Sequence, residues 1–238
     1  MQLFYCADIT GGYATLDAEE SRHAVRVLRL REGDSLLLTS GRGDLYRCTI
    51  ADADERACSL CVEESLPVDV EGPKLCLAVA PTKNPSRMEW LVEKAVEVGV
   101  SRIVLLNCSR SERTFMKTDR LQKIALSAMK QSLHTLLPAI EAPVPVAQWL
   151  AKEGADSTAQ RLIAHCDEDS PRTPIASALH HGADTTVIIG PEGDFAPDEV
   201  EMALSLGFVP VSLGASRLRT ETAALYAAVA FNLINDSQ

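Results

Sequence analysis

The feature that most constrains the fold is a regular alternation of apolar strands and helices after Lys74. The expected strands are Leu75–Ala80, Arg102–Leu106, Arg161–Cys166, Thr185–Ile189 and Phe208–Leu213. The expected helices are Pro85–Val98, Asp119–Leu136, Pro174–His181, Pro197–Leu206 and Thr220–Ile234. Strands that alternate with helices form a mostly parallel sheet covered on both faces. The sequence therefore predicts an α/β domain, with Pro138–Pro145 as a proline-rich connector inside it.

Two of these strands end in glycine-bearing turns that lead into helices. Thr185–Ile189 continues into Gly190-Pro191-Glu192-Gly193-Asp194, and Phe208–Leu213 into Gly214. Ligands of parallel α/β sheets lie outside the carboxyl ends of the strands, and glycine turns expose backbone N–H and C=O groups there. The pattern favours a pocket for a flat polar ligand. Two ordinary strand-to-helix connections explain it equally well, because turn glycines are common.

The first 65 or so residues have a different pattern of short strands between Gly-, Asp- and Arg-rich turns. The expected strands are Gln2–Cys6, Tyr13–Leu16, Ser35–Ser40, Leu45–Ala51 and Ala57–Glu64, interrupted by one helix, Ala18–Leu30. Pro67–Pro73 has the composition of a linker. We expect a small β-barrel-like domain at 1–70 and the α/β domain at 74–238.

Composition excludes several classes of protein. Hydrophobic residues make up 46% of the chain, but no run of them approaches the roughly 18 apolar residues of a membrane span. The sequence also lacks a basic leader. We therefore expect a cytoplasmic protein. Seven scattered cysteines indicate reduced, packed thiols, and Cys58 with Cys61 lacks the partners of a zinc site, so no metal is expected. The GxGxxG, Walker, HExxH and GxSxG motifs are all missing.

Charge is unevenly distributed along the chain. The net charge is −10, which argues against indiscriminate nucleic-acid binding, yet residues 71–130 carry 11 basic and 6 acidic side chains. This basic segment contains Arg110, Arg113, Lys117, Arg120, Lys123 and Lys130. It is either a solvated helix face or a surface that contacts phosphates.

Five blocks, in order, resemble the bacterial 16S rRNA (uracil-N3)-methyltransferases of the SPOUT superfamily nearly end to end. They are His23–Arg29 with Gly33-Asp34, Lys94–Val100 with Ser109-Arg110-Ser111, Gln131-Ser132 with Pro138, Gly190–Gly193, and Leu218–Ala223.

The resemblance implies an N-terminal PUA-like β-barrel for RNA and a C-terminal α/β domain knotted as a trefoil. It also implies a homodimer that methylates N3 of a uridine in 16S rRNA, within the small ribosomal subunit. S-adenosylmethionine would lie against Gly190, Pro191, Glu192, Gly193, Leu213, Gly214, Leu218, Thr220, Thr222 and Ala223.

Roles for charged residues follow from this chemistry. The imide nitrogen of uracil carries a proton, so a group must accept it or stabilise the anion. Arg219 would stabilise that charge, and Glu221 or Glu192 would orient the base or take the proton. A helix-dipole role for Glu221 and a phosphate contact or salt bridge for Arg219 are comparable alternatives. We expect RNA contacts from Arg22, His23, Arg26, Arg29, Arg110, Arg113 and Lys117.

The chain departs from the family pattern at several positions. Asp194 replaces a glycine in the cofactor turn, Ser216-Arg217 replaces Arg-Ile, and Lys130 and His134 flank Gln131 where an acidic residue and an arginine are usual. Two other functions therefore stay open: methylation at another position, such as a ribose 2′-oxygen or a tRNA base, and RNA binding without catalysis.

Overall fold

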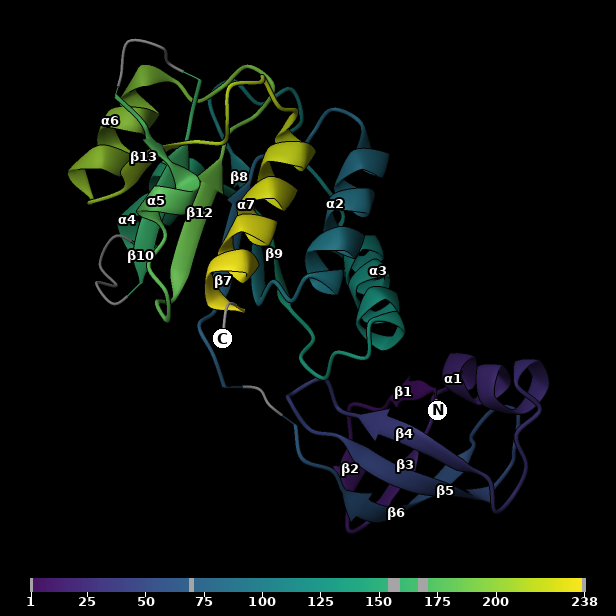
Figure 1. Ribbon diagram of the computed structural model, residues 1–238. Helices are drawn as coiled ribbons and strands as arrows, with labels where there is room; N and C mark the ends of the chain where they lie inside the picture. Colours follow the sequence, from purple (N-terminus) through teal and green to yellow (C-terminus); the bar gives the residue numbers. More distant parts are fainter. Residues whose placement is uncertain (1, 69–70, 154–158, 167–170, 237–238) are drawn as a thin grey trace. The chain divides into compact units, whose positions relative to one another are not determined.

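The computed structural model describes residues 2–68, 71–153, 159–166 and 171–236 (Figure 1). Its contacts divide the chain into two compact units. The first contains residues 1–71 and the segment 126–137, and the second contains residues 72–125 and 138–238. These units are sets of contacts, and the domain limits 1–70 and 74–238 stay predictions.

The first unit is built on a curled six-stranded sheet. Its strands β1 (Leu3–Tyr5), β2 (Ile9–Thr10), β3 (Tyr13–Thr15), β4 (Ser35–Thr39), β5 (Tyr46–Asp52) and β6 (Ser59–Ser65) follow the order β1-β4-β5-β6-β3-β2. All pairs are antiparallel except β1 with β4. Alternate residues such as Leu36, Leu38 and Leu60 point into one core, because successive side chains of a strand face opposite ways.

The single helix expected over Ala18–Leu30 is instead two shorter pieces. Helix α1 (Ala18–Arg22) begins at Asp17, whose carboxylate accepts the N–H groups of Glu19 and Glu20. The chain then widens into the π-helix η1 (His23–Val27), in which the Leu28 N–H reaches the carbonyl of His23. Arg29 has φ of 58°, which ends the helix earlier than periodicity predicted.

The second unit contains the expected parallel sheet. Its seven strands follow the order β11-β13-β10-β12-β7-β8-β9, and every neighbouring pair is parallel. The bounds are β7 (Leu75–Val79), β8 (Arg102–Asn107), β9 (Ala139–Pro145), β10 (Gln160–Ala164), β11 (Thr173–Pro174), β12 (Thr185–Ile189) and β13 (Val209–Ser212). Strands β7 and β12 are buried throughout because both of their faces are covered. The trefoil threading stays a prediction, because strand order does not define a knot.

Helices cover both faces of this sheet (Figure 1). The helices are α2 (Pro85–Glu97), α3 (Thr118–Gln131), α4 (Val146–Glu153), α5 (Ile175–Ala178), α6 (Pro197–Ser205) and α7 (Thr220–Asn235). Helix α7 packs against α2, β7 and β12, whereas α4 and α6 pack together on the other side. Buried Ala224, Ala227 and Ala228 allow the close approach of α7, and Met88, Leu91 and Val92 of α2 point inward as expected.

Two expectations for this unit are wrong. Pro138–Pro145 is largely strand β9 rather than a connector. Among the described strands, β9 lies at the edge of the sheet beside β8. An edge strand tolerates prolines because one of its sides makes no ladder hydrogen bonds. The helix expected over Asp119–Leu136 ends at Gln131, where Leu133 takes φ of 61°. Helix α4 was not expected. Every helix within the described ranges is too short or too polar to cross a bilayer.

Candidate functional site

A cavity of about 390 Å³ opens at the carboxyl ends of β10, β12 and β13. This is the edge at which parallel sheets bind ligands. The lining is mostly turn backbone and small side chains from the two glycine turns, with a third wall that follows β10. The lining residues are Ala164, His165, Cys166, Arg172, Ile189, Gly190, Pro191, Asp194, Val211, Leu213, Gly214, Ala215, Ser216, Arg217, Leu218, Thr220 and Ala223.

The two glycine turns meet directly. The hydroxyl of Thr220, the first residue of α7, donates a hydrogen bond of 3.1 Å to the carbonyl of Gly190. Glycine is favoured at 190 because a Cβ there would lie 3.1 Å from the Phe195 ring, which is tighter than usual packing. Gly214 has φ of 97°, a conformation that side chains disfavour, and no atom comes within 4 Å of where its Cβ would be. The turns therefore present backbone to one shared space.

The turn after β12 is also tied to the loop after β10. The Asp194 carboxylate accepts the N–H of Cys166 at 2.9 Å, and Arg172 donates to the carbonyl of His165 at 2.8 Å. Asp194 has φ of 62°, which explains the usual glycine at this position. Aspartate is among the few residues that tolerate this conformation. The departure from the family pattern thus supplies a hydrogen bond that glycine lacks.

Charges of both signs act at this wall of the cavity. Burial raises the pKa of the Cys166 thiol, Asp194 raises it further, and Arg217 and Arg172 oppose the shift. Cys166 therefore lies within the influence of one carboxylate and two arginines.

Sequence reasoning found two walls of the cavity and missed the third. Of the expected cofactor residues, Gly190, Pro191, Leu213, Gly214, Leu218, Thr220 and Ala223 line it. Residues 164–166 were expected at a strand end, but nothing in the sequence places β10 between β12 and β13. That neighbourhood is visible only in the sheet order.

Three expected cofactor residues lie outside this lining. The Glu192 carboxylate accepts the N–H of Lys83 at 3.1 Å, and Thr222 is exposed on α7. Gly193 backs onto the loop after β8, where a Cβ would come within 3.2 Å of the Cβ of Arg110. The missing side chain at 193 therefore makes room for Arg110.

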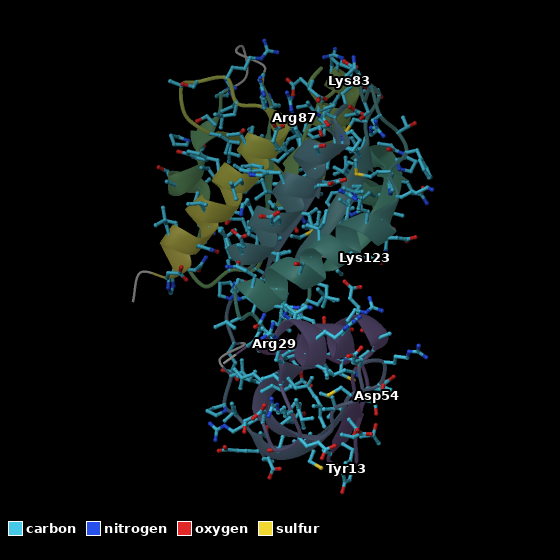
Figure 2. The ribbon with its side chains drawn as sticks, turned by 90° about the vertical axis from the view of Figure 1, so that its right-hand side faces the viewer. Tyr13, Arg29, Asp54, Lys83, Arg87 and Lys123 are labelled. Carbon is cyan, nitrogen blue, oxygen red and sulfur yellow. The ribbon has the colours of Figure 1, made fainter. Side chains whose placement is uncertain are left out.

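The expected catalytic pair occupies contrasting environments at the start of α7. Arg219 is the exposed residue that precedes the helix, whereas Glu221 is 7% exposed. One Glu221 oxygen lies 3.6 Å from Nε of Arg87 in the first turn of α2, and the other has no hydrogen-bond partner among the described residues. Figure 2 labels Arg87 and the neighbouring Lys83. Neither Arg219 nor Glu221 lines the cavity.

Two arginines of the expected RNA surface make contacts within the second unit. The Arg110 guanidinium donates to the carbonyls of Gly193 and Phe195 at 3.3 and 3.2 Å. Arg113 donates to the carbonyl of Lys83 at 3.2 Å, while Lys117 is exposed. Their RNA contacts stay predictions, and Arg110 additionally supports the turn after β12.

The expected RNA residues of the first unit lie on α1, η1 and the turn after it. Arg22 and Arg29 are exposed, and Arg26 forms an exposed ion pair with Glu55 at 3.3 Å. The His23 ring is held by Gln2 at 3.1 Å. These assignments stay predictions.

The cavity fits the methyl donor that the resemblance implies. Its volume lies in the usual range for a ligand site of roughly 300–1,000 Å³. Adenine and ribose need backbone donors and acceptors beside small apolar groups, and the turns at 190–191 and 213–223 supply both. Across the described residues, no cluster of His, Cys, Asp or Glu has the arrangement of a metal site.

Comparison with known proteins agrees with this geometry. The model of the family described as RNA methyltransferase domain matches residues 70–232, and that of the RNA methyltransferase PUA domain matches residues 16–61. The chain is 30% identical to the ribosomal RNA small subunit methyltransferase E of Rickettsia conorii, over 92% of this chain and 89% of that protein. It is 29% identical to the protein of that name from Mycobacterium bovis, over 94% and 88%.

Solved structures give the same result. A probable rRNA-methyltransferase from Porphyromonas gingivalis is 42% identical, covers 99% of both chains and superposes with a TM-score of 0.90. A ribosomal RNA small subunit methyltransferase E from Neisseria gonorrhoeae, bound to S-adenosylmethionine, is 25% identical, covers 100% of both chains and has a TM-score of 0.87. With its parallel sheet, its PUA module and a cavity between two glycine turns, the chain belongs to the RNA methyltransferase family.

Proposed function

We propose that this protein transfers the methyl group of S-adenosylmethionine to N3 of one uridine in 16S rRNA of the small ribosomal subunit. The observation that carries the proposal is the single cavity between the Gly190 and Gly214 turns, joined by the Thr220–Gly190 hydrogen bond. The names of the relatives and the cofactor bound to the Neisseria gonorrhoeae protein support the reaction class. The proposed place of action is the cytoplasm.

The cofactor supplies an activated methyl group, and the protein must align the nucleophile with it. Gly190, Leu213 and Gly214 would hold its adenosine through backbone groups. Uridine N3 loses a proton as it gains the methyl group, so negative charge develops on the base. We assign stabilisation of that charge to Arg219, which is exposed beside the cavity wall. We assign the proton to Glu221, whose buried oxygen has no hydrogen-bond partner in the described chain.

We further propose that the protein acts as a homodimer through α7 and α2, with the second unit threaded as a trefoil knot. The exposed side chains of Tyr226 and Val229 lie one turn apart on α7, and Trp90 is exposed on α2, which packs against α7. Exposed aromatic and apolar side chains on packed helices are a feature of subunit interfaces. The test is molar mass by light scattering. We expect a dimer that Val229→Glu converts to a monomer, and a monomeric native protein would refute the proposal.

The reaction is tested by mass spectrometry of nucleosides from 16S rRNA of a deletion strain. We expect loss of 3-methyluridine alone and its return with the wild-type gene. Loss of a different methylated nucleoside would move the reaction to another position, and an unchanged profile would indicate binding without turnover. Calorimetry with S-adenosylmethionine accompanies this test, because a protein that fails to bind it in the micromolar to millimolar range is not the enzyme.

A further inference from the structure

A second cavity, of about 690 Å³, lies within the first unit. It joins two sequence blocks that the cofactor cavity does not use: the block that begins at His23 and the one that begins at Gln131. Its lining residues are Gln2, Leu3, Glu19, Glu20, His23, Ser127, Lys130, Gln131 and Leu133. A cavity of this size accommodates a nucleotide.

The His23 side of the cavity is held in a fixed geometry. His23 is the first residue of the π-helix η1. Such helices are rare in proteins, and those that occur are frequently found at functional sites. The amide nitrogen of Gln2 lies 3.1 Å from Nε2 of His23, and the Phe4 ring packs against the imidazole with centroids 5.9 Å apart. The ring is therefore already oriented at the edge of the cavity.

The charges at the floor of the cavity compensate one another. Lys130 of α3 forms an ion pair with Glu20 of α1, whose side chain is only 6% exposed, and Glu20 also accepts the N–H of Tyr5 at 3.3 Å. Lys130, which differs from the acidic residue usual in the family, thus has an acidic partner, Glu20, on α1. With Glu19 as a further carboxylate, the lining does not suit a phosphate. Neutral polar groups remain: the exposed Gln131 amide and the exposed Ser127 hydroxyl.

The rim of the cavity contains a leucine in a strained conformation. Helix α3 ends in a Schellman turn, in which His134 N–H bonds to Met129 and Leu133 N–H to Lys130. The residue in the left-handed position of such a turn is usually glycine, but here it is Leu133, with φ of 61° and a side chain that is 58% exposed. Backbone strain of this kind clusters at active sites and ligand-binding sites.

We propose that this cavity binds one unstacked nucleotide of the RNA substrate, with the base against Leu133 and its polar edge toward Gln131 and His23. Proteins read unpaired RNA bases in this way, by apolar or aromatic contact and amide hydrogen bonds. Arg22 and Arg29, exposed at the two ends of the His23 segment, contact the flanking phosphates; Figure 2 labels Arg29. The identity of the ligand as RNA rests on the proposed function above.

The test is binding of 16S rRNA purified from a deletion strain, measured as Kd by filter binding, with Gln131→Ala and Leu133→Gly. We expect each to weaken binding about 5-fold or more, since contact with one base is worth at least that much. Gln122→Ala, an exposed glutamine earlier on α3, should bind as wild type. Leu133→Gly relieves backbone strain, so its Tm should be unchanged or higher, which separates lost binding from lost folding.

Cross-linking of the RNA complex followed by mass spectrometry supplies the second readout. We expect nucleotide adducts on the peptides that contain His23 or Gln131. Wild-type Kd in both variants, or nucleotide adducts confined to peptides that contain neither His23 nor Gln131, would overturn the proposal. Affinity for S-adenosylmethionine should not change. The native protein could bind rRNA without methylating it while the two variants lose binding. That result would refute the proposed reaction and support the nucleotide site. Normal methylation by the native protein, together with wild-type Kd for rRNA in both variants, would refute the nucleotide site and leave the proposed reaction intact.

Discussion

Thr220→Val removes a hydrogen bond that joins the two turns of the cofactor cavity. Thr220 is 5% exposed and the Gly190 carbonyl that it contacts is also buried, so valine leaves that acceptor without this donor. An unsatisfied buried polar group costs about 1–3 kcal/mol. We therefore expect the free energy of unfolding of this unit to fall by about that amount.

The effect on the cofactor follows from the position of this bond. If the bond holds the turns together in the free protein, its loss lowers the population that is competent to bind. The apparent Kd then rises in proportion, by up to about 30-fold for a loss of about 2 kcal/mol.

The assay is calorimetric titration with S-adenosylmethionine, alongside urea unfolding. Thr220→Ser is the matched control, because it keeps the hydroxyl and removes only a methyl group; its Kd should stay within about 3-fold of wild type. Thr220→Val with wild-type affinity would show that the two turns do not depend on each other. An equal loss of cofactor affinity in Thr220→Val and Thr220→Ser would refute the role of the hydroxyl.

Three further predictions concern other contacts. Arg110→Ala removes the donors to the Gly193 and Phe195 carbonyls and should weaken cofactor binding in calorimetry. The control Lys123→Ala, on an exposed position of α3, should bind the cofactor as wild type does. Equal affinities of the two variants would contradict a role for Arg110 in supporting the turn after β12. Burial raises the Asp44 pKa, but hydrogen bonds from Ser40 and Thr39 outweigh it and lower the pKa in the folded state. The stabilising effect of Asp44 relative to Asp44→Asn should therefore be present at pH 7 and disappear as pH falls below about 4 in urea titrations; a pH-independent difference would contradict this. Burial also raises the thiol pKa of three cysteines to about 12, so iodoacetamide at pH 8 should leave them unmodified in the native protein; their native alkylation, detected by mass spectrometry, would contradict it. They are Cys48, Cys76 and Cys108.

Local patterns predicted most elements of the second unit, with α4, β9 and β11 as exceptions, because strands and helices have different hydrophobic periods. Thr185–Ile189 and the turn at Gly190 lie where the sequence indicated, as does the helix that begins at Thr220. Proline content misled at Pro138–Pro145, because an edge strand tolerates residues that a central strand excludes.

The site could be predicted only where it consists of local turns. The walls at Gly190 and Gly214 were found from their glycines, but the wall at Cys166 depends on β10 lying between β12 and β13. Gly193 shows a second limit. Its glycine suggested contact with the ligand, yet the space beside it contains Arg110, which is 83 residues away in sequence. Periodicity also gave no sign of the π-helix at His23, since its backbone bonds leave no distinct side-chain pattern.

The turns at Gly190 and Gly214 form one cavity, and the proposed function requires that this cavity hold the methyl donor. The most direct measurement is a crystal structure of the protein grown with S-adenosylmethionine. We predict ligand density enclosed by Gly190, Leu213 and Thr220, with the third wall formed by residues 164–166. Clear ligand density elsewhere on the molecule, with this cavity filled only by solvent, would show that the two turns do not hold the methyl donor.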